Sequence, residues 1–186
     1  MNLYHLMQYC FFGFGIYNLF FLILSKIKPL QEKIKFKEID QAATTTIIIC
    51  GIIYLINWSF DWIIILNNRE SENSKSIINR LNGPYGFAVY SQSLAYITSS
   101  LLFILNFVKK STLLRFLIGF IFLFNFEKFV IIVTSLHRDY LPSSWTMYQS
   151  TFGWIIVDWI IKTIIFASFT TITYFIINSK KLKFLK

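Results

Sequence analysis

Apolar runs alternate with short polar or basic stretches along the chain, and this alternation predicts five membrane-spanning segments. Each run is near the roughly 20 residues that a helix needs to cross a bilayer. The runs are rich in Ile and Phe, but their length favours helices over strands, and an open sheet would leave backbone groups unpaired in lipid. We therefore expect an all-α integral membrane helical bundle, a single domain over residues 1–186, with segments at residues 6–24, 44–66, 87–108, 113–136 and 152–177.

The composition supports lipid as the main surrounding of this chain. Of its 186 residues, 55% are hydrophobic and only 15% are charged, whereas soluble domains carry roughly 25% charged residues. The net charge of +9 would suit a nucleic-acid partner. The lysines, however, lie between apolar runs and not on one polar face, so we exclude nucleic acid as a partner.

The distribution of basic residues predicts an orientation. Loops on one side and the C-terminal tail carry twelve Lys and Arg residues, and the loops on the other side carry four: Arg69, Lys75, Arg80 and Arg138. Because cytoplasmic loops are enriched in Lys and Arg, we expect the N-terminus outside and the C-terminus in the cytoplasm. Tyr and Trp residues near the outer ends, such as Trp145, fit an interfacial aromatic belt.

The stretch FEKFVIIVTSLHRDYLPSSW carries most of the candidate chemistry, because it places five ionisable residues in or beside a membrane segment. A charge at the bilayer centre costs roughly 2.5 to 3.5 kcal/mol on insertion scales, so such groups usually face a cavity or a partner. Glu127 and Lys128 point about 100 degrees apart on a helix and need partners elsewhere. They suit a proton path or a packing contact equally well. His137, Arg138 and Asp139 end the segment at the expected outer side, where Arg138 and Asp139 could also form an interfacial pair.

Other ionisable residues are expected on the same outer side. Asp61 and Arg80 join the candidate polar cluster, and Asp158 is spaced to pair with Lys162 on one helix face. His5 and His137 share that side, so a haem ligated by both is conceivable, but no haem-attachment motif accompanies them. No phosphate loop or zinc spacing occurs, and Cys10 and Cys50 have no metal-ligand spacing. We therefore expect no directly bound cofactor or metal.

Two motifs give the chain a resemblance to a known family. INRLNGPYGF, at residues 78–87, precedes FEKFVIIVTSLHRDYLPSSW, at residues 126–145, and a weaker match covers residues 39–46. In this order the motifs resemble the NrfD-like (polysulfide reductase, ActC-type) membrane subunits of alternative complex III. The resemblance covers roughly residues 39–150. Family members are much longer, so this chain is similar to their C-terminal part.

The resemblance implies a membrane subunit, whole or split, of a quinol-oxidising respiratory complex in the bacterial inner membrane. Menaquinol or another quinone would be the substrate. Iron–sulfur and multihaem cytochrome subunits would be partners, together with a chain that supplies the missing N-terminal helices. Glu127, Lys128, His137, Arg138 and Asp139 would then take part in quinol binding and proton transfer near the outer face.

Two other interpretations stay open. The chain could be a truncated, non-catalytic remnant or scaffold, because its Ile-, Phe-, Asn- and Lys-rich composition is typical of an AT-biased genome. It could also be a small channel or carrier, although it has no inverted repeat and no helix pair broken by Gly or Pro. Even as a subunit of the respiratory complex, the chain shows no motif for a redox centre, so the redox chemistry would take place on other subunits.

Overall fold

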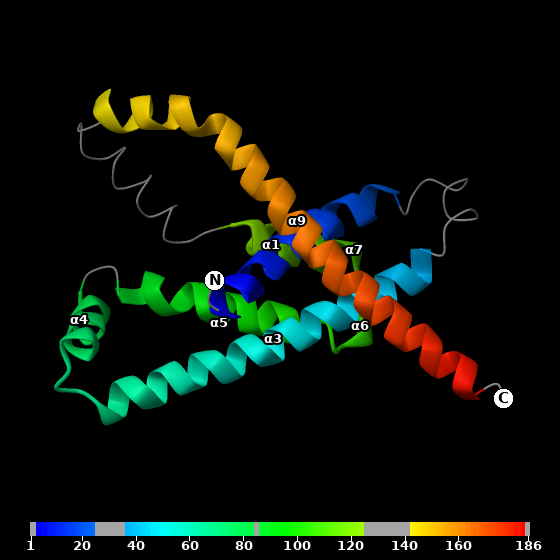
Figure 1. The fold of residues 1–186 in the computed structure, drawn as a ribbon, viewed down its shortest axis with the longest axis horizontal. Helices are drawn as coiled ribbons and strands as arrows, with labels where there is room; N and C mark the ends of the chain where they lie inside the picture. Colours follow the sequence, from blue (N-terminus) through cyan, green and yellow to red (C-terminus); the bar gives the residue numbers. More distant parts are fainter. Residues whose placement is uncertain (1–2, 25–35, 84–85, 125–141, 185–186) are drawn as a thin grey trace.

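The computed structural model describes residues 3–24, 36–83, 86–124 and 142–184. Within these ranges the chain forms helices and no strand, which confirms the all-α fold (Figure 1). The helices are α1 (Leu3–Leu24), α3 (Phe36–Asn67), α4 (Glu72–Leu81), α5 (Gly86–Leu102), α6 (Asn106–Lys110), α7 (Thr112–Leu123) and α9 (Pro142–Phe184).

In the part of the chain that the structure describes, three helices are long and apolar enough to cross a membrane: α1, α3 and the part of α9 from Ile156 to Ser179. The helix α7 is apolar but shorter. At 1.5 Å per residue, the 32 residues of α3 extend about 48 Å and the 43 residues of α9 about 65 Å. Both exceed the roughly 30 Å hydrocarbon core, so these helices either tilt or continue beyond it. Large apolar side chains cover their outer faces, as lipid requires.

The helix α1 lies at the centre of the bundle and packs against α3, α7 and α9. Contacts between the helices fix their directions: Tyr4 meets Ser93 at one end, and Asn18 meets Arg115 at the other. We call the end where α1 begins the proximal end and the end where α1 finishes the distal end. The helices α1, α5 and α9 run from proximal to distal, and α3 and α7 run back, so these helices alternate in direction along the chain (Figure 1).

The expected single helix over 87–108 is interrupted. After Leu102 the backbone N–H groups of Phe103, Ile104 and Leu105 bond to carbonyls three residues earlier, which tightens the last turn and ends α5. The short helix α6 follows, and Ser111 then caps α7 by accepting a hydrogen bond from the Leu114 N–H. The apolar pattern continues through Phe103–Leu105, so hydropathy alone does not reveal this break.

Other helix ends also differ from the expected segments. The helix α3 begins at Phe36, eight residues before the expected start at residue 44. Residues 36–43 contain no Gly or Pro, so nothing in them stops the helix. The helix α9 extends past 152–177 at both ends. Of the expected segment 113–136, residues 113–123 are helical, and residues 125–136 lie outside the described residues.

Small residues allow the helices to approach closely. A Cβ added at Gly15 would lie 3.1 Å from the carbonyl oxygen of Gly119, and these two glycines mark the crossing of α1 and α7. Phe11 and Phe14 of α1 pack on Phe122 of α7, with ring centroids 5.4 and 5.7 Å apart. The core is therefore an aromatic cluster built around α1.

Candidate functional site

The stretch that carries most of the predicted site is not among the described residues. Glu127, Lys128, His137, Arg138 and Asp139 all lie within 125–141, outside the described ranges. Their proposed roles stay predictions.

The two other predicted site residues lie at the proximal end. Asp61 is on α3, six residues before the helix ends, and it is exposed. Arg80 belongs to α4, the short helix that links α3 to α5 at this end (Figure 1). Asp61 and Arg80 therefore share one end of the bundle with the start of α9 (Figure 1).

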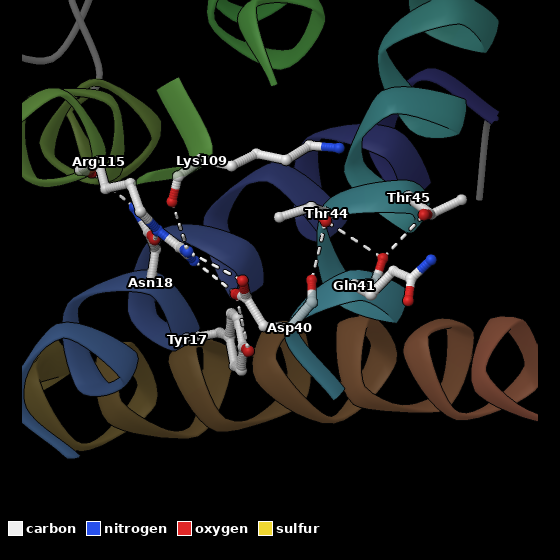
Figure 2. Close-up of polar contacts among 8 residues, drawn as sticks. All are labelled: Tyr17, Asn18, Asp40, Gln41, Thr44, Thr45, Lys109 and Arg115. Carbon is white, nitrogen blue, oxygen red and sulfur yellow. Dashed lines mark hydrogen bonds and ion pairs between the residues drawn. The ribbon is translucent and has the colours of Figure 1, made fainter. Parts of the chain in front are cut away.

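A buried polar cluster at the distal end connects three helices, and we call it the Arg115 cluster. Arg115 of α7 is 2% exposed. Its Nη2 and Nη1 donate to the two carboxylate oxygens of Asp40 on α3, at 2.6 and 3.0 Å. Its Nε donates to Asn18 Oδ1 of α1 at 2.8 Å, and Asn18 Nδ2 returns a hydrogen bond to the Arg115 carbonyl at 2.5 Å (Figure 2).

Further hydrogen bonds and an aromatic ring surround this ion pair. Nη1 of Arg115 also reaches the Lys109 carbonyl at 3.4 Å, and the guanidinium lies 4.2 Å from the centroid of the Phe21 ring. Tyr17 donates to Asp40 Oδ1 at 3.3 Å. A guanidinium presents its donors in a planar fork that matches a carboxylate. Nearly every donor of Arg115 is therefore used within the protein, and the cluster is built as a structural junction.

The sequence indicated Arg115 only as part of the basic count that sets orientation. Asp40 lay before the expected segment 44–66, and Asn18 was one amide in an apolar run. The cluster could have been predicted because each of these polar residues lies within a helix that buries one face. Polar groups in such a position need partners on other helices.

A second polar cluster lies at the proximal end and consists of hydroxyl groups. Tyr54 of α3 donates to the Tyr4 hydroxyl at 2.6 Å, and Ser93 of α5 lies 3.0 Å from Tyr4 and 3.2 Å from Tyr54. The rings of Phe11 and Tyr96 pack around Tyr54. These hydroxyls satisfy one another inside an aromatic surrounding, so they connect α1, α3 and α5 without a charge.

The predicted pairing of Asp158 with Lys162 is confirmed. Lys162 Nζ lies 2.5 Å from Asp158 Oδ2 on the same face of α9. The ammonium also faces two rings of α1, at 4.9 Å from the centroid of Phe12 and 5.2 Å from that of Tyr9. Unlike the Arg115 cluster, this pair is partly open, because 46% of the Asp158 side chain is exposed.

Cys10 of α1 and Cys50 of α3 are buried, free thiols. Among the described residues, no group of three or more His, Cys, Asp or Glu side chains gathers in a way that could hold a metal ion.

The fold and its apolar surface define the class of this protein: an all-α, multi-pass membrane bundle. Comparison with protein-family models, with curated proteins and with solved structures finds no match to the chain.

Proposed function

We propose that this protein is a membrane subunit of a quinol-oxidising respiratory complex in the bacterial inner membrane. It would help to bind quinol and to move protons near the outer face. The observation that carries the proposal is the stretch from Phe126 to Trp145, which places His137, Arg138 and Asp139 directly after an apolar run. In this proposal the N-terminus and the proximal end face outward, and the C-terminus is cytoplasmic.

The chemistry of quinol oxidation suits these residue types. Oxidation of one quinol releases two electrons and two protons. A His titrates near neutral pH and a carboxylate near the outer water can accept a proton, so His137 and Asp139 are the proposed acceptors. Glu127 and Lys128 would belong to a buried polar path between helices, and Asp61 and Arg80 to the outer polar cluster.

The redox centres would belong to other subunits. The chain carries no haem-attachment or iron–sulfur motif in its sequence, so electrons would pass to iron–sulfur and multihaem cytochrome partners. A further chain would supply the helices that the longer family members have before the matching part.

A second candidate function is that of a scaffold without a role in catalysis. The Arg115 cluster favours it, because a buried ion pair with nearly every donor used within the protein joins helices and leaves little for a substrate to bind. In this case the protein would hold neighbouring membrane subunits in place.

Copurification distinguishes the two candidates. The protein is captured from gently solubilised native membranes, and its partners are identified by mass spectrometry. Iron–sulfur and multihaem subunits among the partners support the respiratory function. Capture with membrane proteins that lack redox centres supports the scaffold.

Substitution of Asp139 then tests its role in catalysis. Asp139→Asn should slow quinol oxidation by the assembled complex at least tenfold, since a positioned acid or base typically contributes 10²–10⁴-fold. Glu72→Gln is the matched control, because Glu72 is an exposed carboxylate of α4. Equal turnover of both variants and the wild type would remove Asp139 from the mechanism.

A further inference from the structure

The Asp158–Lys162 pair lies on the seam between α9 and α1, in the proximal half of the bundle. The close approach of the two helices begins at Gly13, where an added Cβ would come within 2.7 Å of the Lys162 carbonyl oxygen. This approach brings the Lys162 ammonium over the rings of Tyr9 and Phe12. The ring of Trp159 extends the aromatic wall, with its centroid 5.8 Å from that of Phe12.

The pair is open toward lipid. Asp158 and Lys162 lie within the apolar part of α9 from Ile156 to Ser179. The side chains are 46% and 19% exposed, and their neighbours Trp159 and Ile161 are exposed apolar residues. Charges within an apolar span pair with one another or face a polar partner, and the exposed Asp158 carboxylate leaves room for such a partner beside the pair.

The chemistry of the seam selects a particular kind of occupant. Asp158 and Lys162 together are neutral, so they do not attract an anionic lipid headgroup as a lysine cluster would. Lys162 uses one of its three N–H donors on Asp158, and Asp158 Oδ1 has no partner among the described residues. The pair can therefore both donate and accept hydrogen bonds. Flat aromatic walls beside it suit a flat ring.

We propose that the α1–α9 seam is a lateral binding site for the headgroup of a quinone or quinol that enters from the lipid. Lys162 donates a hydrogen bond to a quinone carbonyl, and Asp158 accepts one from a quinol hydroxyl. Tyr9, Phe12 and Trp159 pack against the ring. The choice of ligand rests on the proposed quinol-oxidising function, but the site lies outside the stretch from Phe126 to Trp145.

The test uses the whole chain, purified alone into phosphatidylcholine nanodiscs. The probe is a short-chain naphthoquinone with a photoreactive azido group, and labelled positions are mapped by peptide mass spectrometry. The variants are Lys162→Gln and Asp158→Asn. The matched control is Thr163→Val. Thr163 is next to Lys162 in the chain, and its hydroxyl donates a hydrogen bond to the carbonyl of Trp159 in its own helix. Phe12→Leu removes one wall and leaves both charges, so it tests the site even if a charge variant fails to fold.

Label is expected on α1 around Tyr9–Phe12 and on α9 around Asp158–Lys162. Lys162→Gln should weaken saturable labelling at least about tenfold, since it replaces the charged donor with a neutral and shorter one. Phe12→Leu should weaken it severalfold, and Thr163→Val should leave it unchanged.

Three results would overturn the inference: label elsewhere on the chain, equal labelling of all variants, or displacement of the probe by stoichiometric phosphatidylglycerol, which would identify a phospholipid headgroup as the occupant. Because the purified chain has no partners in this assay, its outcome is separate from the copurification result. If the seam is labelled but no respiratory partners copurify, the proposed complex is refuted and the binding site stands. If respiratory partners copurify but the seam is not labelled, the binding site is refuted and the complex stands.

Discussion

Removal of Asp40 tests whether the Arg115 cluster holds the bundle together. Asp40→Ala takes away both acceptors of the Arg115 fork, which lie at 2.6 and 3.0 Å, and leaves a guanidinium whose side chain is 3% exposed. Breaking a buried ion pair by removing one partner costs about 3–5 kcal/mol, because the other charge is left uncompensated. The folded-to-unfolded ratio should therefore fall by two to four orders of magnitude, since each 1.4 kcal/mol is a factor of ten.

The structure also predicts an asymmetry between the two partners. The Asp40 side chain is 18% exposed, so after Arg115→Met its carboxylate can still be hydrated by water. Arg115→Met should therefore destabilise the protein less than Asp40→Ala. The double variant, which buries no charge, should be more stable than Asp40→Ala alone.

Reversible unfolding in mixed detergent and SDS micelles, followed by circular dichroism, measures these free energies. Lys37→Ala is a suitable control, since it removes an exposed charge from the first turn of the same helix. The reasoning would be refuted if Asp40→Ala stayed within about 0.5 kcal/mol of the wild type, or if the double variant were as unstable as the sum of the single ones.

Two further substitutions examine the contacts of α1. Gly13→Ala would push its Cβ into Phe166 and toward the Lys162 backbone of α9, so it should lower the free energy of unfolding by about 1–3 kcal/mol. The same unfolding assay measures this loss, with Ser168→Ala at an exposed position as the control. Equal stability of both variants and the wild type would contradict the close crossing. Tyr54→Phe removes two hydrogen bonds but leaves Tyr4 and Ser93 bonded to each other at 3.0 Å. The free energy of unfolding should therefore fall by only about 1 kcal/mol. A loss as large as that of Asp40→Ala would contradict this reasoning.

The candidate site was predictable only in part. The pairing of Asp158 with Lys162 follows from their spacing on one helix, because residues four apart share a face. The aromatic partners of Lys162 on α1 could not be read in this way, since the sequence does not say which helix packs against which. Asp40 shows the same limit: its role depends on Arg115, which is 75 residues away along the chain.

The sequence by itself determined that this is a helical membrane protein. Long apolar runs in a chain with few charges leave helices as the way to satisfy backbone hydrogen bonds in lipid, and the basic loops predict an orientation. The tertiary structure decided where the helices begin, break and cross. The end of α5 at Leu102 depends on local backbone hydrogen bonds, and the crossings at Gly13, Gly15 and Gly119 depend on which neighbour fills the space beside each glycine. Partner choice among helices is a property of three-dimensional packing, so only the folded bundle shows that Arg115 is an internal junction and that Lys162 faces the α1 seam.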